Sequence, residues 1–251
     1  MKLLILLIVS ALTFSTGFAA EKDTRCFEMR TYYAAPGKLD DLLARFRDHT
    51  VKLFEKHGMV NIGYWVPLTN TENKLVYIMA YPSREAREKS WKEFSSDPDW
   101  NTARKASEAN GNLVKKADSV FLAATDFSAL VQPSQSKESC VFELRTYHAT
   151  PGKLDDLLAR FRDHTKELFA KHGMGQFGYW VPTETKDGST DTLIYILQHK
   201  SPEAAKASFK AFAADPEWTK AKTASEANGP LTIKDGVKSE FMTATDFSPT
   251  K

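Results

Sequence analysis

The chain has 251 residues, and its 34 basic and 32 acidic residues give a net charge of only +2. This balance gives no indication of nucleic acid or an anionic membrane surface as a partner. The sequence contains no H-x-x-x-H, C-x-x-C, G-x-S-x-G or P-loop pattern, which argues against common metal sites, classical hydrolases and nucleotide-binding enzymes. No metal and no cofactor is therefore predicted.

Residues 1–20 have the composition of a secretory signal peptide. Lys2 gives a positive start, an apolar run extends from Leu3 to Leu12, and Gly17 and Ala19 supply small residues near a cleavage point. The apolar run is too short to span a membrane. Without Lys2 the chain has 33 basic and 32 acidic residues, a net charge of +1. We expect a soluble protein that is secreted or periplasmic after cleavage, with no membrane span in the mature chain.

A stretch of 24 residues at 36–59 returns at 151–174 with 21 positions identical. Its apolar residues recur every three or four positions, the spacing that places side chains on one face of an α-helix. These residues are Leu39, Leu42, Leu43, Phe46, Thr50, Leu53 and Phe54. A later helical stretch, 83–111 against 201–229, keeps only 16 of 29 positions. The sequence of the first helix is therefore more strongly constrained, either by packing or by a functional site.

His49 and its copy His164 fall at the border of this apolar face. We expect both to point toward the sheet that the helix covers. Two interpretations stay open: a partly buried structural histidine bonded to a carbonyl or water, and a pocket histidine that acts as base or ligand.

Each copy of the long repeat contains a regular series of elements. In the first copy, strands are predicted at residues 27–33, 62–67, 75–81 and 119–127, and helices within 36–59, at 83–95 and at 100–110. The order βαββαβ is that of a ferredoxin-like domain, with helices on one face of an antiparallel sheet. We predict an α+β protein in which two such domains, residues 25–128 and 139–248, pack sheet to sheet as a closed barrel. A linker at residues 129–138 joins them, and a monomer with an internal pseudo-twofold axis is expected.

The first strand alternates between apolar and polar side chains. Phe27, Met29 and Thr31 share one face, which we expect to meet the helix, so the opposite face should look into the barrel. That second face carries Glu28, Arg30 and Tyr32, copied as Glu143, Arg145 and Tyr147. Because buried charges must pair, the set is either an ion-pair network between the sheets or a polar pocket. In the pocket, the glutamate would act as a base and the arginine would hold an anionic or carbonyl group.

Tyr64 and Trp65 lie on the second predicted strand and return as Tyr179 and Trp180. Large aromatic residues on a strand either pack in a core or line a ligand pocket, and the sequence leaves both possibilities open.

Cys26 and Cys140 are the only cysteines, and export would permit a disulfide between them. Aligning the two copies puts these residues one position out of register, so their side chains should point to opposite faces of the sheet. Two free thiols are the favoured prediction.

Five motifs occur in the same order in both copies: E-M-R-T-Y or E-L-R-T-Y, P-G-K-L, H-G-M, G-Y-W-x-P and D-P-x-W. In this combination the chain resembles the NIPSNAP family over essentially the whole mature chain, as two domains in tandem behind an export signal of bacterial type. The resemblance implies a dimeric α/β barrel, here formed within one chain. Relatives in that superfamily include cofactor-independent monooxygenases and haem-degrading enzymes, and the resemblance implies no common reaction.

Three functions stay open at this point. The leading hypothesis is that each half binds a small apolar or aromatic molecule between its first helix and its sheet, with polar contacts from His49, His164, Tyr64 and Tyr179. The second is a cofactor-independent monooxygenase-like enzyme that uses the same pocket. The third is a non-catalytic protein-interaction module with a filled barrel.

Overall fold

The structure, a computed structural model, describes residues 22–134 and 140–251. The predicted signal peptide and part of the predicted linker lie outside these residues. Within them, eight strands form one closed barrel in the order β1, β3, β2, β8, β5, β7, β6 and β4. The strands are β1 (Cys26–Ala34), β2 (Val60–Pro67), β3 (Lys74–Tyr81), β4 (Val114–Ala124), β5 (Val141–Ala149), β6 (Gly175–Pro182), β7 (Thr192–His199) and β8 (Thr232–Ala244).

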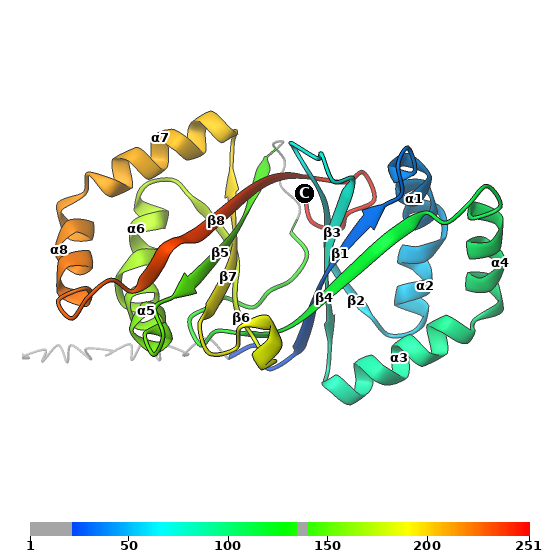
Figure 1. Ribbon diagram of the computed structural model, residues 1–251, viewed down its shortest axis with the longest axis horizontal. Coiled ribbons are helices and arrows are strands. Elements are labelled where there is room, and N and C mark those ends of the chain that lie inside the picture. The colour runs from blue at the N-terminus through cyan, green and yellow to red at the C-terminus, as the bar shows by residue number, and fades with distance from the viewer. Residues whose placement is uncertain (1–21, 135–139) are drawn as a thin grey trace, which may run out of the picture.

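Helices lie outside the barrel, those of the first half at one end of the molecule and those of the second half at the other (Figure 1). In the first half they are α1 (Leu39–Arg45), the π-helical η1 (Phe46–Thr50), α2 (Val51–Lys56), α3 (Arg84–Ser96) and α4 (Pro98–Ser107). The second half repeats them as α5 (Leu154–Arg160), η2 (Phe161–Thr165), α6 (Lys166–Lys171), α7 (Pro202–Ala213) and α8 (Pro216–Ser225), with a short 3₁₀ turn η3 (Thr185–Asp187). The predicted order βαββαβ is confirmed in both halves.

Two short strand pairs join the halves into a single sheet. Residues 65–67 of β2 pair with residues 242–244 of β8, and residues 122–124 of β4 pair with residues 180–182 of β6. The two domains therefore meet sheet to sheet, as the sequence predicted, and backbone hydrogen bonds close the barrel at both seams.

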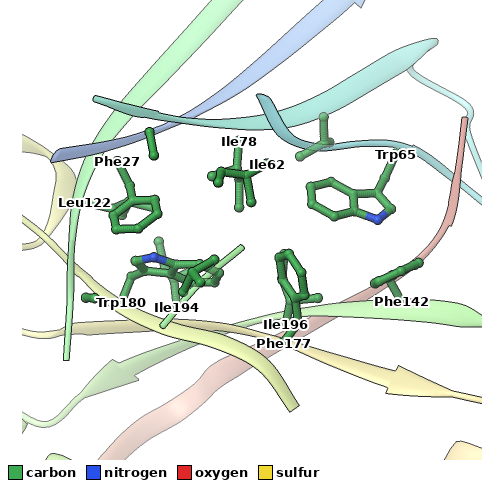
Figure 2. Close-up of a cluster of buried hydrophobic side chains, with 14 of the residues drawn as sticks. Phe27, Ile62, Trp65, Ile78, Leu122, Phe142, Phe177, Trp180, Ile194 and Ile196 are labelled. Atoms are coloured by element: carbon green, nitrogen blue, oxygen red, sulfur yellow. The ribbon is translucent and has the colours of Figure 1, made fainter. Parts of the chain in front are cut away.

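The interior of the barrel is apolar and filled by side chains from both halves (Figure 2). Phe27 and Trp180 approach one another from opposite walls, with ring centroids 6.0 Å apart, and Trp65 packs against Phe142 in the same way at 5.5 Å. The residues that face the interior include Phe27, Ile62, Trp65, Ile78, Leu122, Phe142, Phe177, Trp180, Ile194 and Ile196. This shared core holds the two halves together as one folding unit.

The prediction that the polar face of the first strand looks into the barrel is wrong. Phe27 and Met29 face the interior, so their strand neighbours lie on the outer face under the helices. The outward-facing residues are Glu28, Arg30 and Tyr32, with Glu143, Arg145 and Tyr147 in the second half. The physical reason is that apolar side chains fill the barrel interior, whereas the helices supply partners for buried charges.

The first helix contains a π-helical segment that changes which side chains reach the sheet. In η1, Phe46 and Thr50 are buried, while His49 is exposed. A π turn winds through fewer degrees per residue than an α turn, so the regular spacing used to place His49 no longer holds across it. The expectation that His49 and His164 point toward the sheet is therefore wrong, since His164 in η2 is exposed in the same way.

The segments that follow β4 and β8 cross between the halves. Both carry the sequence T-D-F-S, at residues 125–128 and 245–248. The first segment hydrogen-bonds to both backbone groups of Tyr179 in β6, and the second does the same to Tyr64 in β2. Arg162 of η2 bonds Asp126, and Arg47 of η1 bonds Asp246. Each first helix is thus fixed in part by the tail of the other half.

Two further predictions concern the thiols and the membrane. Cys26 and Cys140 are both free, as the register argument predicted. Among the described residues, every helix is too short or too polar to cross a bilayer.

Candidate functional site

An aromatic cleft opens in the first half between the first helix, α3, α4 and the outer face of the sheet, with a volume of about 250 Å³. Its walls are six aromatic rings, from Tyr32, Phe46, Phe54, Trp91, Phe94 and Trp100. Phe46, Phe54 and Phe94 form a buried floor, whereas Ala117 and Ser95 lie exposed at the mouth. The remaining lining comes from Arg45, Thr50, Glu108 and Val114. An apolar hollow with a few polar groups is the usual form of a small-molecule site.

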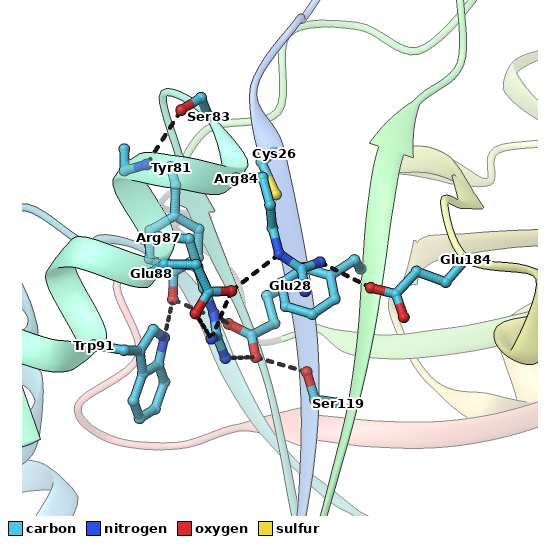
Figure 3. Close-up of polar contacts among 12 residues, drawn as sticks. Cys26, Glu28, Tyr81, Ser83, Arg84, Arg87, Glu88, Trp91, Ser119 and Glu184 are labelled. Carbon is cyan, nitrogen blue, oxygen red and sulfur yellow. Dashed lines mark hydrogen bonds and ion pairs between the residues drawn. The ribbon is translucent and has the colours of Figure 1, made fainter.

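Two aromatic walls of this cleft, Trp91 and Tyr32, are held by a buried hydrogen-bond network around Glu28 (Figure 3). The Nε1 group of Trp91 donates to the hydroxyl of Tyr81 at 2.8 Å, and that hydroxyl donates to Glu28 at 3.3 Å. The guanidinium of Arg30 stacks on the ring of Trp91 at 4.4 Å and donates to the hydroxyl of Tyr32. Two of the cleft's aromatic walls are therefore positioned by the same carboxylate.

Glu28 is fully buried and stays ionised because cations surround it. Arg87 of α3 binds both of its oxygens, at 2.7 and 2.9 Å, and Arg30 and Ser119 bind one of them. Burial alone would raise the pKa of Glu28, but the hydrogen bonds from Arg87 and Ser119 and the charge of Arg30 lower it to about 2. Both oxygens of Glu28 are occupied by hydrogen bonds, so the carboxylate serves to position the neighbouring arginines.

A second buried pair lies at the other side of the cleft. Arg45 has a side chain only 4% exposed, and its Nη1 donates to Glu108 at 2.9 Å and to Ser107 at 3.3 Å. The guanidinium also lies over the ring of Trp100, 5.2 Å from its centroid. Arg45 and Glu108 both line the cleft, so an ion pair forms its most polar part.

The six candidate ligand residues from the sequence do not line this cleft. Tyr64 and Tyr179 are buried beneath the first helix of each half, with hydroxyls that donate to Asn61 and Gln176. Trp65 and Trp180 lie inside the barrel. His49 and His164 border polar grooves of about 340 and 410 Å³ on the outer side of the first helix. Of the strand candidates, Tyr32 alone lines the cleft, while Glu28 and Arg30 support it from behind.

The NIPSNAP family model matches residues 27–129 and 142–249, which together make up most of the chain. The chain belongs to the NIPSNAP family. This tandem NIPSNAP protein is 23% identical over 196 residues to "Protein NipSnap homolog" of Dictyostelium discoideum, an alignment that covers 76% of each chain.

Solved structures that resemble the tandem NIPSNAP chain show its fold. An anthrone oxidase-like protein matches with a TM-score of 0.57 at 12% identity, covering 91% of this chain and 94% of that one. A putative monooxygenase from Fusobacterium nucleatum matches with a TM-score of 0.57 at 10% identity, covering 88% and 92%. The predicted dimeric α/β-barrel fold, completed here by two halves of one chain, is confirmed.

The second NIPSNAP domain carries the same framework with different side chains around the corresponding region. The pair of Arg160 and Glu226 repeats that of Arg45 and Glu108, at 2.8 Å. Four cleft-lining positions differ between the domains. Trp91, Ser95, Val114 and Ala117 correspond to Phe209, Ala213, Thr232 and Val237. The two domains therefore present different surfaces at this place.

Sequence reasoning missed the residues that form most of the cleft, above all Trp91, Trp100 and the pair of Arg45 and Glu108. One signal did point to the pair. The motif A-S-E-A-N-G, residues 106–111, returns intact at residues 224–229. It supplies the serine and glutamate that hold the arginine of the first helix.

Proposed function

We propose that this protein binds a small aromatic molecule in the aromatic cleft of its first domain. The observation that carries the proposal is a hollow of about 250 Å³ walled by six aromatic rings, with a single ion pair as its main polar feature. An apolar cavity of about 150 Å³ in another protein binds benzene, so this volume suits one or two fused rings. Aromatic walls favour a flat ligand through edge-to-face and stacked contacts.

Titration of the purified protein with naphthalene tests this proposal, because Trp91 and Trp100 line the cleft and their fluorescence should report an occupant. The variant Ala117→Phe places a large side chain at the exposed mouth and should weaken binding at least tenfold. Val237→Phe is the matched control, since Val237 occupies the same strand position in the second domain and is also exposed. Equal binding by both variants and the unmodified protein would place the ligand elsewhere.

The natural occupant can be sought in the protein purified from its own host. Native mass spectrometry would detect a retained molecule and, in the same spectrum, the monomer mass that we propose for the intact assembly. Loss of the molecule in the Ala117→Phe variant would assign it to the cleft. Oxygen uptake with a bound ring compound would extend the proposal to the oxygenase chemistry named for the putative monooxygenase that shares the fold.

The proposed cellular site is outside the cytoplasm. It is supported by the charge, apolar run and small residues of 1–20. The mass of the protein from its own host tests it, because cleavage near Ala20 would remove about twenty residues. A full-length mass in the cytoplasmic fraction would contradict it.

A further inference from the structure

The polar end of the aromatic cleft is the ion pair of Arg45 and Glu108, and not all of its donors and acceptors are used. Arg45 uses Nη1 for both of its hydrogen bonds, and Glu108 accepts through Oε1. Among the described residues, Nε of Arg45 is buried without a hydrogen-bond partner, and Oε2 of Glu108 accepts no hydrogen bond from Arg45. Both residues line the cleft, and Arg45 also lines the polar groove on the outer side of the first helix. The ion pair thus keeps an unused donor on one cleft-lining residue and an unused acceptor on the other.

This pair is also electrically balanced and partly shielded from solvent. The arginine side chain is 4% exposed and the glutamate side chain is 24% exposed, so charges there are only partly screened. An anionic ligand would bring a second negative charge beside Glu108, and a cationic ligand would bring a second positive charge beside Arg45. Either ligand would disturb a pair that is already neutral as a whole.

We infer that the cleft's ligand is a neutral aromatic molecule with a hydroxyl group, which accepts a hydrogen bond from Arg45 and donates one to Glu108. A hydroxyl is suited to the pair because it is donor and acceptor at once. The inference rests on the proposed function, since it specifies what kind of molecule enters the same cleft. The rings of Phe94 and Trp100, 4.5 Å apart, lie beside the pair and would contact the aromatic part.

Three probes that differ in one group test this inference at pH 7: naphthalene, 2-naphthol and 2-naphthoate. At this pH the naphthol is neutral and the naphthoate is ionised. The dissociation constants should rank naphthol tightest, roughly tenfold tighter than naphthalene because of hydrogen bonds to charged groups, and naphthoate weakest. Naphthoate binding as tightly as naphthol would overturn the inference, whereas no binding of any probe would overturn the proposed function instead.

The variant Glu108→Gln sharpens the test because it removes the negative charge and leaves Arg45 unbalanced. The order should then reverse, with naphthoate binding more tightly than naphthol. The matched control is Glu226→Gln, which breaks the equivalent pair with Arg160 in the second domain and should keep the original order. An unchanged order in a folded Glu108→Gln protein would contradict the inference. If that variant does not fold, the ranking of the three probes on the unmodified protein still decides.

Discussion

Each half buries a glutamate at the equivalent strand position, but the two glutamates have different partners. Glu28 meets two guanidinium groups, from Arg30 and Arg87, whereas Glu143 meets one guanidinium and the imidazole of His199 at 3.0 Å. The strand motif that carries the glutamate, F-E-x-R-T-Y, is shared by both halves, but the helix and strand packed beside it differ.

The changed positions compensate one another. Arg87 corresponds to Ala205, so the second half lacks that cation on α7. Tyr81 corresponds to His199, whose imidazole on β7 contacts Glu143 instead. A buried carboxylate therefore requires donors and positive charge around it but does not require particular residues. The same F-E-x-R-T-Y pattern is therefore accommodated in both halves by different neighbours.

The largest effect should come from removing the carboxylate of Glu28. Glu28→Gln leaves two guanidinium groups without a buried counter-charge, so we expect the free energy of unfolding to fall by about 3–5 kcal/mol. Glu143→Gln leaves only one guanidinium without a buried counter-charge, so the loss should be smaller, about 1–3 kcal/mol. Urea unfolding measures both. An equal or larger loss for Glu143→Gln would break the comparison.

The second effect is the pH dependence of stability that Glu28 confers. Folding lowers the pKa of Glu28 from its usual 4.5 to about 2, because Arg87, Arg30 and Ser119 outweigh the cost of burial. The stabilisation is therefore complete above pH 4.5 and is lost as the pH falls toward 2, a change of about 3 kcal/mol. Between pH 5 and pH 2, the free energy of unfolding should fall about 3 kcal/mol less in Glu28→Gln than in the unmodified protein. Parallel curves would show that Glu28 does not titrate as described.

A third effect separates the two crossing tails. Phe127 packs on Tyr179 with centroids 5.5 Å apart, and Phe247 packs on Tyr64 at 5.4 Å and on Phe46 at 6.2 Å. Replacing either phenylalanine by alanine should cost about 2–3 kcal/mol, below the range for a fully enclosed ring, because Phe127 keeps 8% of its surface exposed and Phe247 is only half-buried.

The ligand distinguishes the tail variants. Phe46 is part of the floor of the aromatic cleft, so Phe247→Ala should also weaken naphthalene binding, whereas Phe127→Ala should leave it unchanged. Thermal unfolding and fluorescence titration measure the two properties separately. Equal binding by the two variants would mean that the tail of the second half does not support the cleft.

The smallest effect concerns the ion pairs between tails and helices. The side chains of Arg47 and Asp246 are 43% and 61% exposed, and those of Arg162 and Asp126 are similarly open. Asp246→Asn and Asp126→Asn should each reduce stability by less than about 1 kcal/mol, and added salt should remove the difference. A loss of several kcal/mol in either variant would assign the tails a larger electrostatic role than their exposure allows.

The sequence predicted the fold well because the repeat and the strand alternation are properties of the chain itself. It failed on the direction of the first strand because alternation separates two faces without saying which one is inside. Both faces of β1 are covered, one by the opposite sheet and one by helices. The partner that settles the question, Arg87, lies about sixty residues away, so no local pattern around Glu28 could reveal it.

The candidate site was less accessible to sequence reasoning. The placement of His49 assumes a regular helix, but the helix contains a π-helical segment and His49 lies on the outer surface. The cleft is assembled from the first helix, β1, α3, α4 and β4, and its volume depends on how far apart these elements pack. Ordinary core residues such as Phe54 and Phe94 carry no local signal that a hollow lies beside them.

The crossing T-D-F-S tails have a consequence for folding in dilute surroundings. A chain with a single copy of the repeat would have to obtain its tail contacts and its seam strand from a second molecule, and its stability would then depend on protein concentration. Here the connector keeps the other copy within reach at all times, so assembly is an internal event with a fixed effective concentration. The covalent duplication makes completion of the barrel independent of encounter between molecules.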